Sequence, residues 1–175
     1  MQIKKYKIKI AQNNGFTLME VMAAIFIILI GLVGIMSLIA SSLYAGTLST
    51  SRLIAANLAQ EGIEVVKNIR DLNYGANSWD NWYAPTPVGI ADGTYSVQYD
   101  SQALGSSAGN YLNYNSTSGL YSYNTTGTYV VAPFKRLITI STISAVAKDV
   151  VSQVTWTERG VPRSIVVEDR LWNWR

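Results

Sequence analysis

A single carboxylate stands at the start of a long uncharged stretch. Glu20 directly precedes residues 21–51, which contain no charged side chain, and residues 21–40 are almost wholly apolar. A helix of 20 such residues spans about 30 Å, the thickness of bilayer hydrocarbon. An ionisable side chain costs roughly 2.5–3.5 kcal/mol at the membrane centre and less near its edge. A carboxylate in this position therefore calls for a cationic partner.

Two small-residue junctions flank the apolar stretch. A secretory signal has a basic start, an apolar core of about 7–15 residues and a small-residue cleavage point. The basic start is present, but the apolar stretch is too long for such a core. Ala45–Gly46 is one candidate junction, although Leu43 stands where a small residue is wanted. A cut at the other, Gly15–Phe16, would remove the basic start and keep the apolar helix.

The charges around the apolar stretch predict its orientation in a membrane. Four lysines precede it, and the first basic residue after it is Arg52. Because lysine and arginine are retained on the cytoplasmic side, we expect a single-pass membrane protein with a cytoplasmic N-terminus and everything after Ala40 outside.

Cleavage after Gly15 would create a cation for Glu20. The new α-amine of Phe16 would lie four residues before Glu20, about 6 Å along a helix axis. Opposite charges within about 4 Å attract far more strongly in a low dielectric than in water. A subunit displaced axially by that amount could therefore place its amine at this carboxylate. The alternative is a Glu20 that is solvated at the headgroup level and has no such role.

The sequence Gly15-Phe16-Thr17-Leu18-Met19-Glu20-Val21 resembles the prepilin motif of type IV pilins and type II secretion pseudopilins. The resemblance implies cleavage after Gly15 by prepilin peptidase and N-methylation of Phe16 by the same enzyme. It also implies that Glu20 neutralises the amine of a neighbouring subunit during filament assembly. The resemblance covers residues 4–71, where it departs from many major pilins in lacking a proline inside the helix.

The same resemblance implies partners and a location. The expected partners are the prepilin peptidase/methyltransferase, other pilin subunits, the lipid bilayer and an inner-membrane assembly platform. The expected destination is an extracellular or periplasmic filament, a fimbrium or a type II secretion filament. No cofactor, metal or catalytic residue is expected.

Composition narrows the chemistry of the rest of the chain. The 175 residues carry a net charge of +3, but the first fifteen hold four of the fourteen Lys and Arg, leaving ten against eleven acids. Nucleic-acid binding by the remainder is therefore not favoured. Without His or Cys there is no disulfide, no His/Cys zinc site, and no Ser-His-Asp or Cys-His catalysis. The chain is accordingly not expected to be an enzyme.

After Arg52 the pattern becomes amphipathic. The apolar positions follow helical spacing and are Ala55, Ala56, Ala59, Gly62, Ile63, Val66 and Ile69. We predict one helix over residues 16–72, with residues 16–40 in the membrane and the later part packed on a head. The predicted organisation is a leader at residues 1–15, this helix, and a β-rich head at residues 73–175, with Asn73 and Gly75 ending the helix.

The head contains strand patterns in its later part. Short alternating runs lie at residues 94–99 and 128–131, and longer ones at 136–143, 150–158 and 163–171. Arg159–Gly160 fits a hairpin turn between the last two. The closing hairpin is similar to that of minor pilins of the PilV kind. The predicted fold class is α+β, a long N-terminal helix packed on a C-terminal antiparallel sheet, the pilin fold.

Several residues of the head have an alternative interpretation. The aromatic cluster at residues 79–83 could be an adhesive loop, which makes a single-pass anchored surface protein the alternative function. Asp92 and Asp100 could help to bind calcium, although no EF-hand spacing is present.

Asn115 and Asn124 fit the N-glycosylation pattern. Seven basic residues from Lys135 onward against four acids indicate a mildly positive sheet. An enzyme without His or Cys would need paired carboxylates. The available ones, Asp149, Glu158, Glu168 and Asp169, are interpreted as surface residues of strands or turns.

Overall fold

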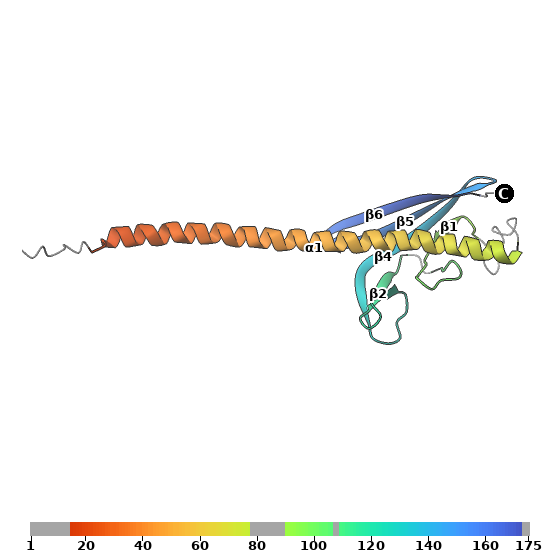
Figure 1. The fold of residues 1–175 in the computed structure, drawn as a ribbon, viewed down its shortest axis with the longest axis horizontal. Helices are drawn as coiled ribbons and strands as arrows, with labels where there is room; N and C mark the ends of the chain where they lie inside the picture. Colours follow the sequence, from red (N-terminus) through yellow and green to blue (C-terminus); the bar gives the residue numbers. More distant parts are fainter. Residues whose placement is uncertain (1–14, 78–89, 107–108, 173–175) are drawn as a thin grey trace, which may run out of the picture. The chain divides into compact units, whose positions relative to one another are not determined.

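The computed structural model describes residues 15–77, 90–106 and 109–172. It divides into two compact units, Met1–Gly46 and Thr47–Arg175. The elements (Figure 1) are α1 (Leu18–Asn77), β1 (Gly93–Tyr95), β2 (Tyr111–Asn115), β3 (Tyr121–Ser122), β4 (Tyr129–Ser144), β5 (Ala147–Glu158) and β6 (Val161–Trp172).

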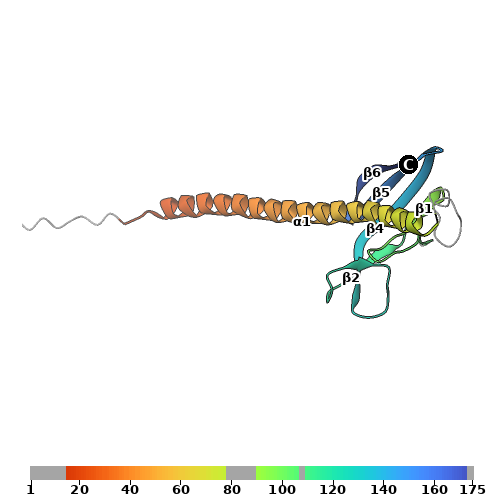
Figure 2. The same cartoon turned by 45° about the vertical axis from the view of Figure 1, so that its right-hand side comes forward.

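The predicted α+β class is confirmed. All strand pairs are antiparallel, and the sheet has the order β3-β2-β4-β5-β6, with β1 paired to β4. In the second unit the long strands run beside the later part of α1, which lies on one face of the sheet (Figures 1 and 2). The single long helix and the sheet thus form the two layers of this unit.

Helix α1 differs from the prediction at both ends. It begins at Leu18, not Phe16, and reaches Asn77. The predicted end at Leu72 is wrong, because Asn73 and Gly75 lie within the helix. Each costs a helix interior about 1 kcal/mol or less relative to alanine, which neighbouring turns can offset.

The part of α1 in the first unit has no apolar partner among the residues that the structure describes. Its large apolar side chains are exposed along the whole of residues 18–39. Among the described residues, α1 is the one helix that is long and apolar enough to cross a membrane. Hydrocarbon or other helices are the environments that would satisfy this surface.

The C-terminal strands lie where the sequence predicts them. The runs at 150–158 and 163–171 are contained in β5 and β6, joined by Arg159–Gly160 with φ angles of 48° and 80°. Two positive φ values are typical of the type I′ hairpin turn. The runs at 128–131 and 136–143 are one strand, β4. Pro133 is tolerated within it because the β4 register with β2 shifts at this point.

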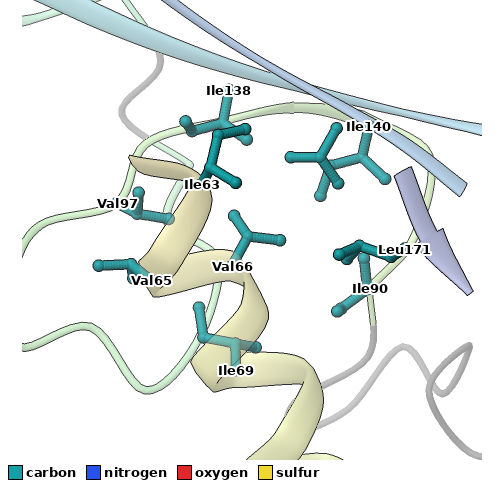
Figure 3. Packing of buried hydrophobic residues seen from close by; sticks show 10 residues of the cluster. Ile63, Val65, Val66, Ile69, Ile90, Val97, Ile138, Ile140 and Leu171 are labelled. Carbon is teal, nitrogen blue, oxygen red and sulfur yellow. The ribbon is translucent and has the colours of Figure 1, made fainter. Parts of the chain in front are cut away.

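The core of the second unit consists of two apolar clusters. The first joins the helix to the later part of β4, the start of β5 and the end of β6 (Figure 3). It contains Ile63, Val65, Val66, Ile69, Ile90, Val97, Ile138, Ile140, Val150 and Leu171. The second lies toward the start of this helix segment and contains Ala55, Leu58, Ala59, Leu112, Ala132, Phe134, Val154 and Trp156. The predicted apolar stripe of the helix is therefore its core face.

A polar layer separates the two clusters. Gly62 packs closely on the sheet, where Arg136 and Ser152 are both fully buried. The Arg136 guanidinium donates hydrogen bonds to the Leu58 carbonyl at 2.8 Å, to Glu61 Oε1 at 2.9 Å and to the Val97 carbonyl. A buried cation is tolerated only when it is paired in this way. The layer therefore ties helix, sheet and the segment after β1 together.

Candidate processing and assembly site

The Gly15–Phe16 bond lies just outside the helix. Gly15 to Thr17 have no regular secondary structure, and α1 begins at Leu18. A Cβ added to Gly15 would meet no atom within 4 Å, and the Phe16 side chain is 81% exposed. The bond is therefore in an accessible, non-helical segment, as a protease substrate must be.

Thr17 caps the helix. Its carbonyl accepts hydrogen bonds from the N–H groups of Glu20 at 3.1 Å and Val21 at 3.2 Å. Its hydroxyl accepts a further hydrogen bond from the Glu20 N–H at 3.3 Å. Thr17 is thus the N-cap residue, and the sequence Thr17-Leu18-Met19-Glu20 has the spacing of a capping box. This role was not predicted, although the Thr-x-x-Glu spacing could have revealed it.

Glu20 occupies the first turn of α1. A carboxylate there is favoured by the positive end of the helix dipole and by the free N–H groups of the first turn. Glu20 is exposed, and among the described residues no cation forms an ion pair with it. The capped start fixes Thr17 and Glu20 within one turn of each other. The carboxylate is therefore directed into the surroundings of the helix end.

The Asp92 carboxylate is bound by a buried lysine and is therefore poorly suited to binding calcium. Its carboxylate accepts hydrogen bonds from Lys148 Nζ at 2.8 Å, from the Thr142 hydroxyl at 2.7 Å and from the Thr142 N–H at 3.0 Å. These bonds, the one from Lys148 foremost, lower the pKa of Asp92 to about 2. Asp100 accepts a hydrogen bond from Gln98 at 2.7 Å instead of joining Asp92.

Two of the four surface carboxylates of the sheet, Asp149 and Asp169, are engaged in ion pairs. Asp149 pairs with Arg170 at 2.8 Å, and Asp169 pairs with Lys67 of α1 at 2.5 Å. The Lys67 contact lowers the pKa of Asp169, so this carboxylate is held in its charged form. In the described ranges no group of three or more metal-ligating side chains is found.

The remaining candidates are dispersed. The aromatic cluster at residues 79–83 lies outside the described residues. Asn115 accepts hydrogen bonds through Oδ1 from the N–H groups of Thr117 and Ser118, so its side chain closes a turn. Two of the basic residues behind the expectation of a mildly positive sheet, Arg136 and Lys148, are buried and paired.

Comparison with known proteins gives one match. Residues 10–36 match the family model of the prokaryotic N-terminal methylation motif. No curated protein and no solved structure matches the chain. The matched segment contains Gly15, Phe16, Thr17, Glu20 and the start of the exposed apolar helix. It supports a pilin-like protein with an N-terminal methylation motif and a transmembrane helix.

Proposed function

We propose that this protein is a minor pilin or pseudopilin, a structural subunit of a type IV pilus or a type II secretion-like filament. Prepilin peptidase cuts the chain after Gly15 and methylates Phe16. The mature protein is held in the membrane by the apolar part of α1 with its head outside. Other pilins and an inner-membrane assembly platform then draw it into an extracellular or periplasmic filament.

One observation carries this proposal. The methylation motif coincides with an exposed Gly15–Phe16 bond, a capped helix start at Thr17 and a helix whose first half exposes its apolar side chains in the described structure. After cleavage the amine of Phe16 and the carboxylate of Glu20 are the two charges at the apolar end of the helix. In a helical assembly each subunit contacts its successors through different surfaces, so the amine of one copy can meet the carboxylate of the next.

Mass spectrometry of the native protein tests the cleavage. We expect a mature chain that begins with N-methyl-phenylalanine at position 16. In Gly15→Ala processing should slow and the precursor should accumulate, because the substitution adds a side chain directly before the cut. A native chain that retains its lysine-rich leader would contradict the proposal.

Glu20→Ala separates processing from assembly. The variant should be inserted and cleaved as the parent is, because the apolar helix and Gly15 are unchanged, but it should be depleted from purified filaments. Glu64→Ala, which removes an exposed carboxylate further along α1, is the matched control and should be incorporated normally. Equal incorporation of both variants would refute the role of Glu20.

A further inference from the structure

The outer edge of β6 is open. β6 ends the strand order, and among the described residues no strand pairs with its other side. It is paired with β5 over all its length, from Val161 opposite Glu158 to Trp172 opposite Ala147, without a register shift. The free edge of a strand presents N–H and C=O groups that can pair with another strand.

The hairpin turn determines which backbone groups face outward. In a two-residue hairpin the residues that flank the turn, here Glu158 and Val161, exchange hydrogen bonds with each other. Because the register is unbroken, the odd-numbered residues of β6 direct their backbone groups toward β5. The even-numbered residues direct theirs away from the sheet. The Arg170 N–H fits this assignment, since it donates to the Asp169 carboxylate and not to β5.

Both ends of this open edge are blocked, whereas its middle is not. Pro162 has no N–H to offer, and the outward N–H of Arg170 is occupied by Asp169 at 2.8 Å. Between them Ser164, Val166 and Glu168 keep their outward backbone groups. Natural proteins protect edge strands with proline and with charged residues. Here the protection leaves a pairing segment of defined length, residues 163–169.

This segment is complementary to itself when reversed. An antiparallel second copy centred on Val166 places Ile165 opposite Val167 and Arg163 opposite Asp169, whose carboxylate also pairs with Lys67 of its own chain. A centre one residue earlier or later places Arg163 opposite Val167 or Leu171 instead, so the charges select one register. Among the described residues Arg163 forms no ion pair with a carboxylate, so its charge can pair with one from a second copy.

We propose that residues 163–169 of β6 pair antiparallel with the same residues of a second copy of this chain, with Val166 opposite Val166. The pairing joins two sheets into one and forms about six backbone hydrogen bonds. Opposite charges face each other at both ends of the paired segment, and apolar side chains face each other in its middle. The association is isologous, with a two-fold axis at Val166.

The geometry fixes which copies can pair. The two-fold axis of a continuous sheet is perpendicular to the sheet and reverses every direction within it. The segment of α1 in the second unit lies on the sheet and runs beside β6 (Figures 1 and 2), so the two helix segments are antiparallel in the pair. The pairing is therefore distinct from the head-to-tail contacts of a helical assembly.

Single cysteines test the register, because the chain has no cysteine of its own. In the proposed pair Ser164 lies opposite Glu168 of the second copy, with their Cα atoms about 5.5 Å apart. Two Ser164 residues are more than about 13 Å apart, beyond the reach of a disulfide. Mixing full-length Ser164→Cys with Glu168→Cys in detergent under mild oxidation should give disulfide-linked dimers, whereas Ser164→Cys alone should not.

Two further variants serve as controls. Val131→Cys places a cysteine on β4, at a residue that is 68% exposed but distant from the β6 edge, and should give no disulfide-linked dimers. Val166→Pro in both members of the mixed pair removes the central outward N–H but no hydrogen bond to β5. It should abolish cross-linking with an unchanged near-UV spectrum, whereas Val166→Thr should preserve cross-linking.

Several outcomes would overturn the proposal. Cross-linking of Ser164→Cys with itself would indicate parallel pairing or random collision. Cross-linking that survives Val166→Pro in a folded protein would show that the edge is not used. Glu20→Ala should leave all these results unchanged, so failure of filament assembly is distinguishable from failure of the pairing.

Discussion

At the residue scale, Gly62 is the closest approach of the helix to the sheet. A Cβ added there would lie 2.6 Å from Ser152 Oγ, 2.8 Å from Ile138 Cδ1 and 3.2 Å from Arg136 Cδ. In most helices alanine is better than glycine by about 1 kcal/mol. Here the three contacts reverse this preference, because the neighbours are themselves fully buried.

We therefore predict that Gly62→Ala lowers the free energy of unfolding of the second unit by about 1–2 kcal/mol. Thermal unfolding followed by near-UV circular dichroism would measure it. Gly46→Ala is the matched control, since its Cβ would meet no atom within 4 Å, and it should not destabilise this unit. Adding Ser152→Ala to Gly62→Ala should recover part of the loss by removing the nearest atom.

Asp92 makes the stability of the head depend on pH in the acidic range. Its pKa is about 2 in the folded protein against an ordinary 3.8. A carboxyl group whose pKa is lowered by folding stabilises the protein above its ordinary pKa, and this contribution is lost as pH falls through the folded value. The contribution of the Lys148 and Thr142 contacts should therefore be complete near neutral pH and disappear between about pH 4 and pH 2.

Asp92→Asn should test this dependence. At neutral pH we expect a loss of about 1–2 kcal/mol, because Lys148 stays buried without its counter-charge while the Asp92 position is half exposed. The difference in unfolding temperature between parent and variant should shrink as pH falls from 4 to 2. A difference that is constant over this range would contradict the role of the charge.

At the element scale, β4 places two neighbouring cations on opposite faces of the sheet. Arg136 points inward and is fully buried, whereas Lys135 lies on the outer face, 4.3 Å from the centre of the Tyr111 ring. Only a guanidinium has enough donors in fixed directions to reach two carbonyls and a carboxylate at once. The alternation of β4 thus gives one cation a structural role and leaves the other at the surface.

We predict that Arg136→Lys destabilises the second unit by about 2–4 kcal/mol, because one ammonium cannot serve Leu58, Glu61 and Val97 from this position. Chemical denaturation of the full chain in detergent would measure the loss. Lys135→Arg, the reverse change one residue earlier, should be neutral within about 0.5 kcal/mol. Equal effects of the two substitutions would argue against a special role for the buried guanidinium.

Some helices and strands are predicted well from the sequence, and others are not. The apolar stripe of α1 and the alternation of β5 and β6 are regular, so hydrophobic periodicity locates them. β2 is irregular, because Leu112 and Asn113 are both buried at a register shift, and the Asn113 side chain donates to the Asn124 carbonyl. A polar residue buried next to an apolar one breaks the two-residue alternation on which strand prediction depends.

At the scale of the whole molecule, local motifs are predictable but contacts between distant residues are not. The motif at Gly15–Glu20 and the amphipathic change after Arg52 are continuous in sequence. The pairing of Arg136 with Glu61 joins residues that belong to different elements, as does that of Lys148 with Asp92. Both buried cations resemble ordinary charges on alternating strands, so their burial follows from the tertiary packing alone.

The polar layer at Gly62 also has a mechanical consequence. With purely apolar faces, only side-chain packing opposes the sliding of a helix along a sheet. Sliding by about 5.4 Å here would bring a residue with a side chain over Arg136 and separate the guanidinium from its three acceptors. The polar layer holds the helix in register with the sheet, so that tension along α1 is transmitted to β4 and β5 without slippage.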